Sequence, residues 1–245
     1  LHHAISTFGK PDDPSTPIKP SEGGDAGAAL LQQQLMTFVP GNEHYMYPEN
    51  TALLLTKGSS FFTQMHYTPY GKAAKDKSRI GLYFRKDAPK NVLRHSTIVN
   101  PFMSIPPQVD AHKETAYFQP DRDIIVYSLF PHAHYRGKSS EFILRYPDGT
   151  EKMILSVPNY DFNWQTTYQL TEPKVLPAGT VVVHNTSWDN SAQNPANPDH
   201  NREVPWGLQS WDEMLFGSVK WRYLHPQEGD ASTGFGIVEG EEPES

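Results

Sequence analysis

The strongest hydrophobic pattern in the chain runs from Ile124 to Phe130, where β-branched and aromatic residues follow one another without a charge between them. This composition predicts a buried β-strand. If the strand continues through Pro131, side chains alternate between faces, and His132 and His134 project to the same side, about 6–7 Å apart at Cα. Two imidazoles at that separation can bind one metal ion. The alternative is a half-buried or exposed pair whose rings bond to loops or water.

Alternating hydrophobic and polar positions predict further strands separated by turns. Pro147-Asp148-Gly149 stands between two of them and predicts the turn of a β-hairpin. Residues 28–34 are expected to form a short helical turn, and residues 10–29 and 185–207 form long loops rich in turn-forming residues. The predicted strands cover residues 1–9, 51–55, 60–67, 80–84, 142–146, 153–157, 163–170, 179–184 and 216–223.

The spacing of these strands, with 22 Pro and 17 Gly in 245 residues and no heptad pattern, predicts an all-β fold. We expect two antiparallel β-sandwich (jelly-roll-like) domains in series. A Pro-containing charged segment near residue 88 marks the boundary between an N-terminal domain, 1–88, and a C-terminal domain, 89–228. Residues 229–245 form an acidic flexible tail. Because the chain opens within a strand pattern, we expect the upstream strands of the first domain to be missing.

Charge and composition exclude several classes of binding partner and of metal site. The net charge is −7 and no basic run occurs, which argues against nucleic acid and anionic membranes as partners. No apolar stretch approaches the roughly 20 residues of a membrane-spanning helix. The chain has no Cys, so disulfides and thiolate metal sites are excluded. It also starts without a signal peptide, as expected of a mature or trimmed chain.

The candidate metal ligands are therefore imidazoles and thioethers. A thioether is a soft donor, and together with imidazoles it favours copper, particularly Cu(I), over zinc or iron. For the candidate thioether, Met214, packing in the core is the alternative. Gln64 lies on the same predicted strand face as His66. The candidate ligands are His2, His3, His66, His132, His134 and Met214. His44, His95, His112, His200 and His225 show no partner pattern and are interpreted as surface or locally bonded.

Four short motifs in order resemble the copper type II, ascorbate-dependent monooxygenase family, which includes peptidylglycine α-hydroxylating and dopamine β-monooxygenases. The similarity spans roughly residues 1–225. H-x-H or H-H alone is weak, whereas four matches in family order, each on a predicted strand, are specific. The motifs are His2-His3 followed by Phe8-Gly9, Gln64-Met65-His66-Tyr67, His132-Ala133-His134, and Asp212-Glu213-Met214.

The resemblance implies two copper ions per chain. The first, at His2, His3 and His66, would store and deliver an electron, with Gln64 in the space between the sites. The second, at His132, His134 and Met214, would activate dioxygen for hydroxylation of a substrate C–H bond. The implied partners are a small-molecule substrate, O₂ and a reductant such as ascorbate, and the implied location is secreted or periplasmic.

The chain also departs from the family. Animal members are rich in disulfides, so the absence of Cys points to a bacterial-type member. Peptidylglycine enzymes hold the substrate carboxylate with Arg, Asn and Tyr, where this chain has Phe130, Phe216 and Ser218. A glycine-extended peptide is therefore not expected as the substrate, and the more apolar pocket suggests a less charged molecule.

Two other classes compete with this hypothesis. A cupin-like mononuclear metal oxygenase would use His132 and His134 with Glu141 and His184, the last after the turn at residues 177–179. That choice leaves His2, His3, His66 and Met214 unexplained. A non-catalytic β-sandwich ligand-binding module would instead stack a ligand on Trp188, Trp206 or Trp211.

Two expectations follow for the arrangement in space. The two ligand sets fall on opposite sides of the boundary near residue 88, so we expect two metal sites on different sandwiches, facing each other across a solvent-filled cleft. We also expect the first site to lose metal more readily, because His2 and His3 stand at the start of the chain, where termini fray.

Overall fold

The computed structural model describes residues 3–9, 33–39, 44–55, 58–68, 70–87, 89–227 and 230. Within these ranges the protein contains strands and no α-helix, so the predicted all-β class is confirmed. Nearly all strand pairs are antiparallel, as short connecting turns favour. None of the described segments is a helix that could span a membrane.

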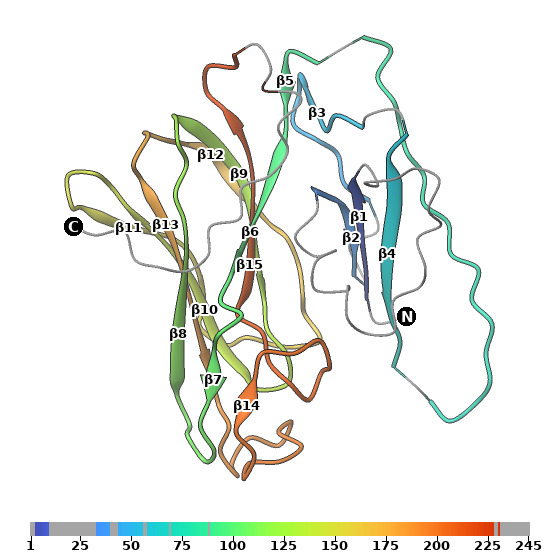
Figure 1. The fold of residues 1–245 in the computed structure, drawn as a ribbon, viewed down its shortest axis with the longest axis vertical. Helices are drawn as coiled ribbons and strands as arrows, with labels where there is room; N and C mark the ends of the chain where they lie inside the picture. Colours follow the sequence, from blue (N-terminus) through green and yellow to red (C-terminus); the bar gives the residue numbers. More distant parts are fainter. Residues whose placement is uncertain are drawn as a thin grey trace.

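The C-terminal region is a sandwich of two four-stranded sheets (Figure 1). One sheet has the order β12-β9-β15-β6 and the other the order β11-β10-β13-β8. The strands are β6 (Arg94–Val99), β8 (His112–Phe118), β9 (Ile124–His132), β10 (Gly137–Arg145), β11 (Glu151–Val157), β12 (Tyr168–Leu176), β13 (Val181–Trp188) and β15 (Phe216–Tyr223). Two short pairs accompany them, β7 (Ser104–Ile105) with β14 (Val204–Pro205), and β3 (Thr51–Ala52) with β5 (Asn91–Val92).

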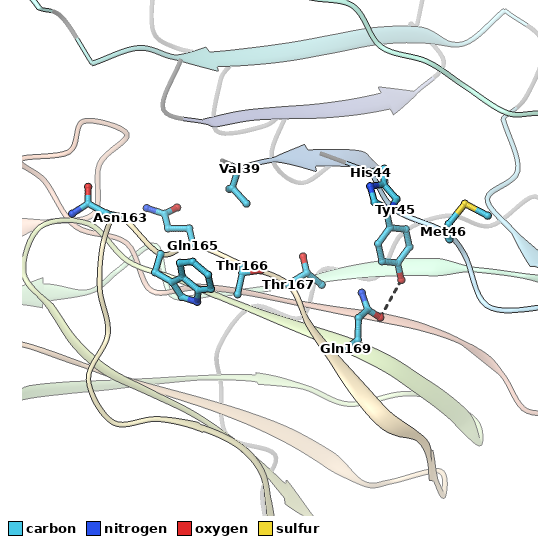
Figure 2. A pocket seen from close by; sticks show the side chains of 10 residues that line it. Val39, His44, Tyr45, Met46, Asn163, Gln165, Thr166, Thr167 and Gln169 are labelled. Atoms are coloured by element: carbon cyan, nitrogen blue, oxygen red, sulfur yellow. Dashed lines mark hydrogen bonds between the residues drawn. The ribbon is translucent and has the colours of Figure 1, made fainter. Parts of the chain in front are cut away.

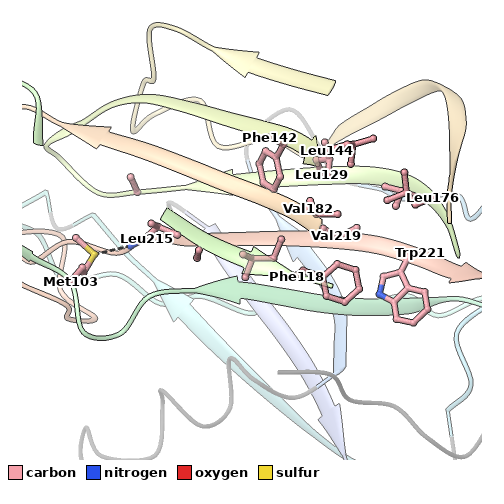
Figure 3. Packing of buried hydrophobic residues seen from close by; sticks show 14 of the residues in the cluster. Met103, Phe118, Leu129, Phe142, Leu144, Leu176, Val182, Leu215, Val219 and Trp221 are labelled. Carbon is pink, nitrogen blue, oxygen red and sulfur yellow. Dashed lines mark hydrogen bonds between the residues drawn. The ribbon is translucent and has the colours of Figure 1, made fainter. Parts of the chain in front are cut away.

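Alternating side chains from both sheets fill the space between them (Figure 3). Phe142 and Leu144 on β10 face Leu129 on β9 and Val219 on β15, and all four are fully buried. Each such side chain contributes roughly 1.5–3 kcal/mol through removal from water. This core fixes the end of β9, where His132 lies.

The N-terminal region forms a three-stranded sheet of order β2-β1-β4 in the described residues. Its strands are β1 (His3–Gly9), β2 (Gln33–Phe38) and β4 (Ser60–His66). The buried Ile5 of β1 packs with Phe130 of β9 and Phe216 of β15 in a second apolar cluster. The N-terminal sheet therefore contacts the outer face of the sheet that carries His132. The domain boundary near residue 88 remains a prediction, and nearly all of the expected tail lies outside the described residues.

Several predicted strands agree with the structure and others do not. The hairpin turn is confirmed, with Gly149 at φ 81° between β10 and β11. The strand predicted at 80–84 is wrong, because residues 70–87 are exposed and form no ladder. The strand predicted from residue 163 begins only at Tyr168. Gln33 and Gln34 belong to β2 and not to a helical turn, whose residues 28–32 lie outside the described part.

Candidate metal centre

The H-x-H segment lies where β9 ends and meets the start of β15. Register pairs His132 with Phe216, two residues after Met214. His132 and His134 are buried, with exposed fractions of 6% and 3%, and their ring centroids lie 5.1 Å apart at 90°. Both side chains line one small cavity, together with Met214. The predicted projection of both imidazoles to the same side is therefore what the structure has.

Hydrogen bonds determine which ring nitrogen of each histidine can bind a metal. His134 Nδ1 lies 3.2 Å from the carbonyl oxygen of Asp212, and a carbonyl only accepts, so Nδ1 carries the proton. His132 Nδ1 lies 2.7 Å from Gln165 Oε1. The Gln165 amide nitrogen donates to the carbonyl of Phe162 at 2.9 Å, which orients Oε1 towards His132. In metal-binding histidines one ring nitrogen is held by an acceptor in this way and the other binds the metal, which here would be Nε2 of each ring.

A buried carboxylate holds the backbone of the same segment. Glu213, fully buried, accepts from the backbone N–H of His134 at 2.7 Å and of Arg136 at 2.6 Å. It also accepts from the indole N–H of Trp188 at 3.0 Å. Burial raises the pKa of Glu213 to about 7, and these hydrogen bonds oppose the shift. One side chain from the 212–214 motif therefore fixes the turn that presents His134.

The hydroxyl of Tyr160 also holds the backbone of the H-x-H segment. The hydroxyl of Tyr160 donates to the carbonyl of Ala133 at 2.9 Å and accepts from its N–H at 3.0 Å. Gly137 lies under the same ring, and a Cβ at this position would stand 2.6 Å from the Tyr160 ring and 2.9 Å from Ala133 Cβ. Only glycine fits there without displacing the H-x-H segment.

Apolar side chains surround Met214. It is 3% exposed and packs with Ile5, Phe130 and Phe216. The rings of Phe130 and Phe216 lie 6.2 and 5.7 Å from the His132 ring. The apolar character expected from Phe130 and Phe216 is thus found next to His132.

Burial also lowers the pKa of His134 to about 4, so the imidazole is neutral at pH 7.

The first ligand set is brought together by strand pairing. His3 on β1 stands directly opposite His66 on β4, and their rings stack with centroids 4.0 Å apart and planes at 24°. The register of β1 and β4 therefore brings the two imidazoles into contact. His2 lies outside the described residues. Gln64 lines the same cavity as the two histidine pairs.

The expected solvent-filled cleft is absent from the described part of the protein. The ring centroids of His3 and His132 lie only 6.2 Å apart, because the N-terminal sheet packs against the sandwich. The cavity between the two sets has a volume of about 20 Å³, enough for about one water molecule. Among the described residues, no three His, Asp or Glu side chains are grouped to hold one metal ion. A site of two imidazoles and a thioether needs no such group.

The residues of the competing hypotheses lie elsewhere. His184 belongs to the other sheet of the sandwich, where its Nε2 lies 2.8 Å from Ser140 Oγ and its ring stacks on Phe142. It therefore does not join His132 and His134 as a cupin ligand would. Trp188 is fully buried and bonds Glu213, so it offers no stacking platform. His95, interpreted as surface or locally bonded, is buried on β6.

Sequence reasoning missed three residues that hold the site. Gln165, Tyr160 and the carboxylate of Glu213 approach the H-x-H segment from positions 27 to 79 residues away along the chain. The motif at 212–214 pointed to the place of Glu213 but not to its bonds. Nothing in the pattern around Gln165 or Tyr160 indicated their roles.

The chain is similar at low identity to two DBH-like monooxygenase proteins. It is 24% identical to "DBH-like monooxygenase protein 2" of Mus musculus over 205 residues, which covers 75% of this chain and 33% of that protein. It is 23% identical to "Putative DBH-like monooxygenase protein 2" of Homo sapiens over 226 residues, covering 83% and 45%. The chain thus spans less than half the length of these relatives.

Other comparisons add little. No protein-family model matches the chain. Among solved structures, that of the infectious bursal disease virus Gx strain matches with a TM-score of 0.29 and 10% identity, over 94% of this chain and 53% of that chain. A likeness this low carries no argument about the fold or the function.

Proposed function

We propose that the chain is part of a copper-dependent monooxygenase that hydroxylates a substrate C–H bond with O₂ and an external reductant such as ascorbate. The observation that carries the proposal is the pair of imidazoles with Nδ1 held by acceptors, facing the same cavity as a buried thioether. This donor set suits copper, and particularly Cu(I). The distant similarity to DBH-like monooxygenase proteins supports the same class.

The residues form two proposed sites. One lies on the three-stranded N-terminal sheet, and the other lies on the sandwich sheet that packs against it. His132, His134 and Met214 would hold the copper that activates dioxygen, and His2, His3 and His66 the copper that delivers the second electron. Copper supplies one-electron transfer and oxygen activation, which no side chain of the chain provides. The protein holds the imidazole tautomers, and its apolar cluster excludes water from the thioether.

The remaining parts of the proposal rest on the family resemblance. The substrate is a small, weakly charged molecule, since Phe130 and Phe216 border His132. Gln64 lies between the proposed sites. The two sites belong to separate domains, 1–88 and 89–228, and the protein acts in a secreted or periplasmic location.

Substitution of Met214 by Ile tests the proposal. Ile keeps the volume and the apolarity of the side chain, so the free energy of unfolding should change by less than about 1.5 kcal/mol. The same change removes the thioether, so Cu(I) affinity and O₂-dependent turnover should fall sharply. X-ray absorption of the Cu(I)-loaded protein should show a copper–sulfur contact that is lost in Met214→Ile.

Met153, half exposed on β11, provides the matched control. Met153→Ile should leave the copper–sulfur contact in place. A contact that survives in Met214→Ile, or unchanged Cu(I) affinity in that variant, would refute the assignment of the second site. Iron or manganese at one equivalent per chain would favour the cupin-like alternative.

A further inference from the structure

A second hollow lies beside the metal centre and shares no lining residue with it. Its volume is about 430 Å³, within the range of small-molecule pockets. One wall comes from residues 44–46 and the other from residues 163–169, which lead into β12 (Figure 2). The two hollows therefore differ about twentyfold in volume, about 430 Å³ for this pocket against about 20 Å³ for the cavity at the metal centre.

Specific contacts hold the two walls together. The hydroxyl of Tyr45 donates to Gln169 Oε1 at 3.4 Å, across 124 residues of sequence. Lys220 of β15 places its ammonium 3.9 Å from the ring centroid of Tyr45 and 5.3 Å from that of Tyr47. These cation–π contacts anchor the 44–47 segment on the sandwich, so the pocket is a built feature of the fold.

Uncharged polar groups dominate the pocket lining. The ten lining residues contain no Asp, Glu, Lys or Arg and one imidazole, that of His44; their amides and hydroxyls are those of Asn163, Gln165, Thr166, Thr167 and Gln169. Amide and hydroxyl groups both donate and accept hydrogen bonds, which matches a ligand whose groups do the same. A charged ligand would find no carboxylate, ammonium or guanidinium among these side chains.

The rim adds apolar surface. Trp164 is 66% exposed and Met46 is 81% exposed, although both are side chains that usually bury most of their area. An exposed indole beside amides and hydroxyls complements a molecule with an apolar C–H face and hydroxyls around its edge. Sugars and cyclic polyols have this combination.

We propose that this pocket binds a neutral saccharide. Gln165 connects it to the metal centre, because the side chain that lines the pocket also faces His132 Nδ1 at 2.7 Å. The pocket is thus on the Nδ1 side of His132, whereas Nε2 is the atom proposed to bind the metal. A bound saccharide would contact the metal ligand only through Gln165, so the inference does not depend on the proposed function.

Saturation-transfer-difference NMR of the purified chain tests the inference with cellobiose, maltose, methyl β-galactoside and N-acetylglucosamine. Glucuronate and glucosamine are the charged counterparts. We expect at least one neutral probe to bind, equally before and after chelation with EDTA, and the charged sugars to bind more weakly. Trp164→Ala and Gln169→Leu should weaken binding about tenfold, while circular dichroism shows an intact fold.

Trp211→Ala is the matched control, since Trp211 is 52% exposed and lies outside the pocket lining. It should bind the neutral probe like the unmodified chain. The inference is overturned if no neutral probe binds, if Trp164→Ala binds as well as the unmodified chain, or if charged and neutral sugars bind alike. Binding that chelation abolishes would place the ligand at the metal cavity and would overturn it as well.

Discussion

The two histidine sets of this protein are positioned by different means. His3 and His66 face each other because β1 and β4 pair in one register, so the backbone ladder brings them together. His132 and His134 are instead held by side chains and carbonyls from segments far apart in sequence. The first set is positioned by strand register, whereas the second is oriented before any metal arrives.

This difference has a physical consequence for the two sites. A ligand whose ring orientation is already fixed by hydrogen bonds, as in His132 and His134, loses little conformational freedom on binding a metal. The sandwich region should therefore be sensitive to changes in its supporting hydrogen bonds, and the three-stranded region should be less so. Four sets of substitutions, each with a control, follow from this comparison.

The largest expected effect is that of Glu213→Ala. The change leaves the N–H groups of His134, Arg136 and Trp188 without their buried acceptor, and each unsatisfied donor costs about 1–3 kcal/mol. We expect the free energy of unfolding in urea to fall by about 3 kcal/mol or more. Glu151→Ala, which removes an exposed pair with Arg145, should cost less than about 1 kcal/mol. Equal losses of unfolding free energy in the two variants would contradict the role of Glu213 as the buried acceptor of these three hydrogen bonds.

Gly137→Ala should have the next largest effect. Its Cβ would stand against Tyr160 and Ala133, and overpacking of this kind typically costs about 1–3 kcal/mol. Gly81→Ala is the matched control in the N-terminal region, because no atom lies within 4 Å of a Cβ at that position. The thermal midpoint should drop for Gly137→Ala and stay unchanged for Gly81→Ala. A similar midpoint for both would show that the turn tolerates a side chain.

A pair of histidine substitutions compares the two sets directly in chelated protein. His132→Ala deprives the buried Gln165 of its imidazole partner, whereas His66 is only half-buried and lies on β4, at the edge of the three-stranded sheet in the described residues. We expect His132→Ala to lower the free energy of unfolding by about 1 kcal/mol more than His66→Ala does. Chemical denaturation of both variants measures the difference, and a larger loss in His66→Ala would reverse the comparison.

The smallest effect concerns pH and the sandwich core. Burial lowers the pKa of His184 to about 3, against 6.5 for an unfolded histidine. Between these values the unfolded chain binds more protons, so the stability from neutral His184 is full above pH 6.5 and is lost as pH falls. We expect this residue alone to remove about 1 kcal/mol between pH 6 and 5.

The pH dependence is checked by denaturation at several pH values in the presence of EDTA. His184→Gln should give a shallower slope than the unmodified chain. His225→Gln, at an exposed position, should leave the slope unchanged. Identical slopes for all three proteins would mean that His184 is not the group that titrates.

The parts of the fold that sequence could predict are those with a strong local pattern. Residues 124–130 are apolar enough to specify a buried strand, and Pro147-Asp148-Gly149 specifies a turn whatever surrounds it. The 163–165 stretch was mispredicted because Asp161 accepts from the N–H of Asn163 and Trp164 there, which forms a turn before β12.

The candidate ligands were recognisable because their order along the chain resembles a family, whereas their supports were not. Gln165 meets His132 across 33 residues and Glu213 meets His134 across 79, and no local periodicity encodes such contacts. The closeness of the two histidine sets was also beyond prediction. It depends on Ile5 packing against Phe130, an interaction between two regions that sequence patterns treat separately.

The exposed segment 70–87 also has a consequence for solubility. It carries Tyr83, 99% exposed, and Phe84, 75% exposed, in an extended stretch without a strand partner in the described residues. Such stretches tend to pair with copies of themselves, and flanking cations oppose this by mutual repulsion. Arg79 and Arg85 flank the aromatic pair here. Salt shortens the range of that repulsion, so the protein should remain dispersed most readily at low ionic strength.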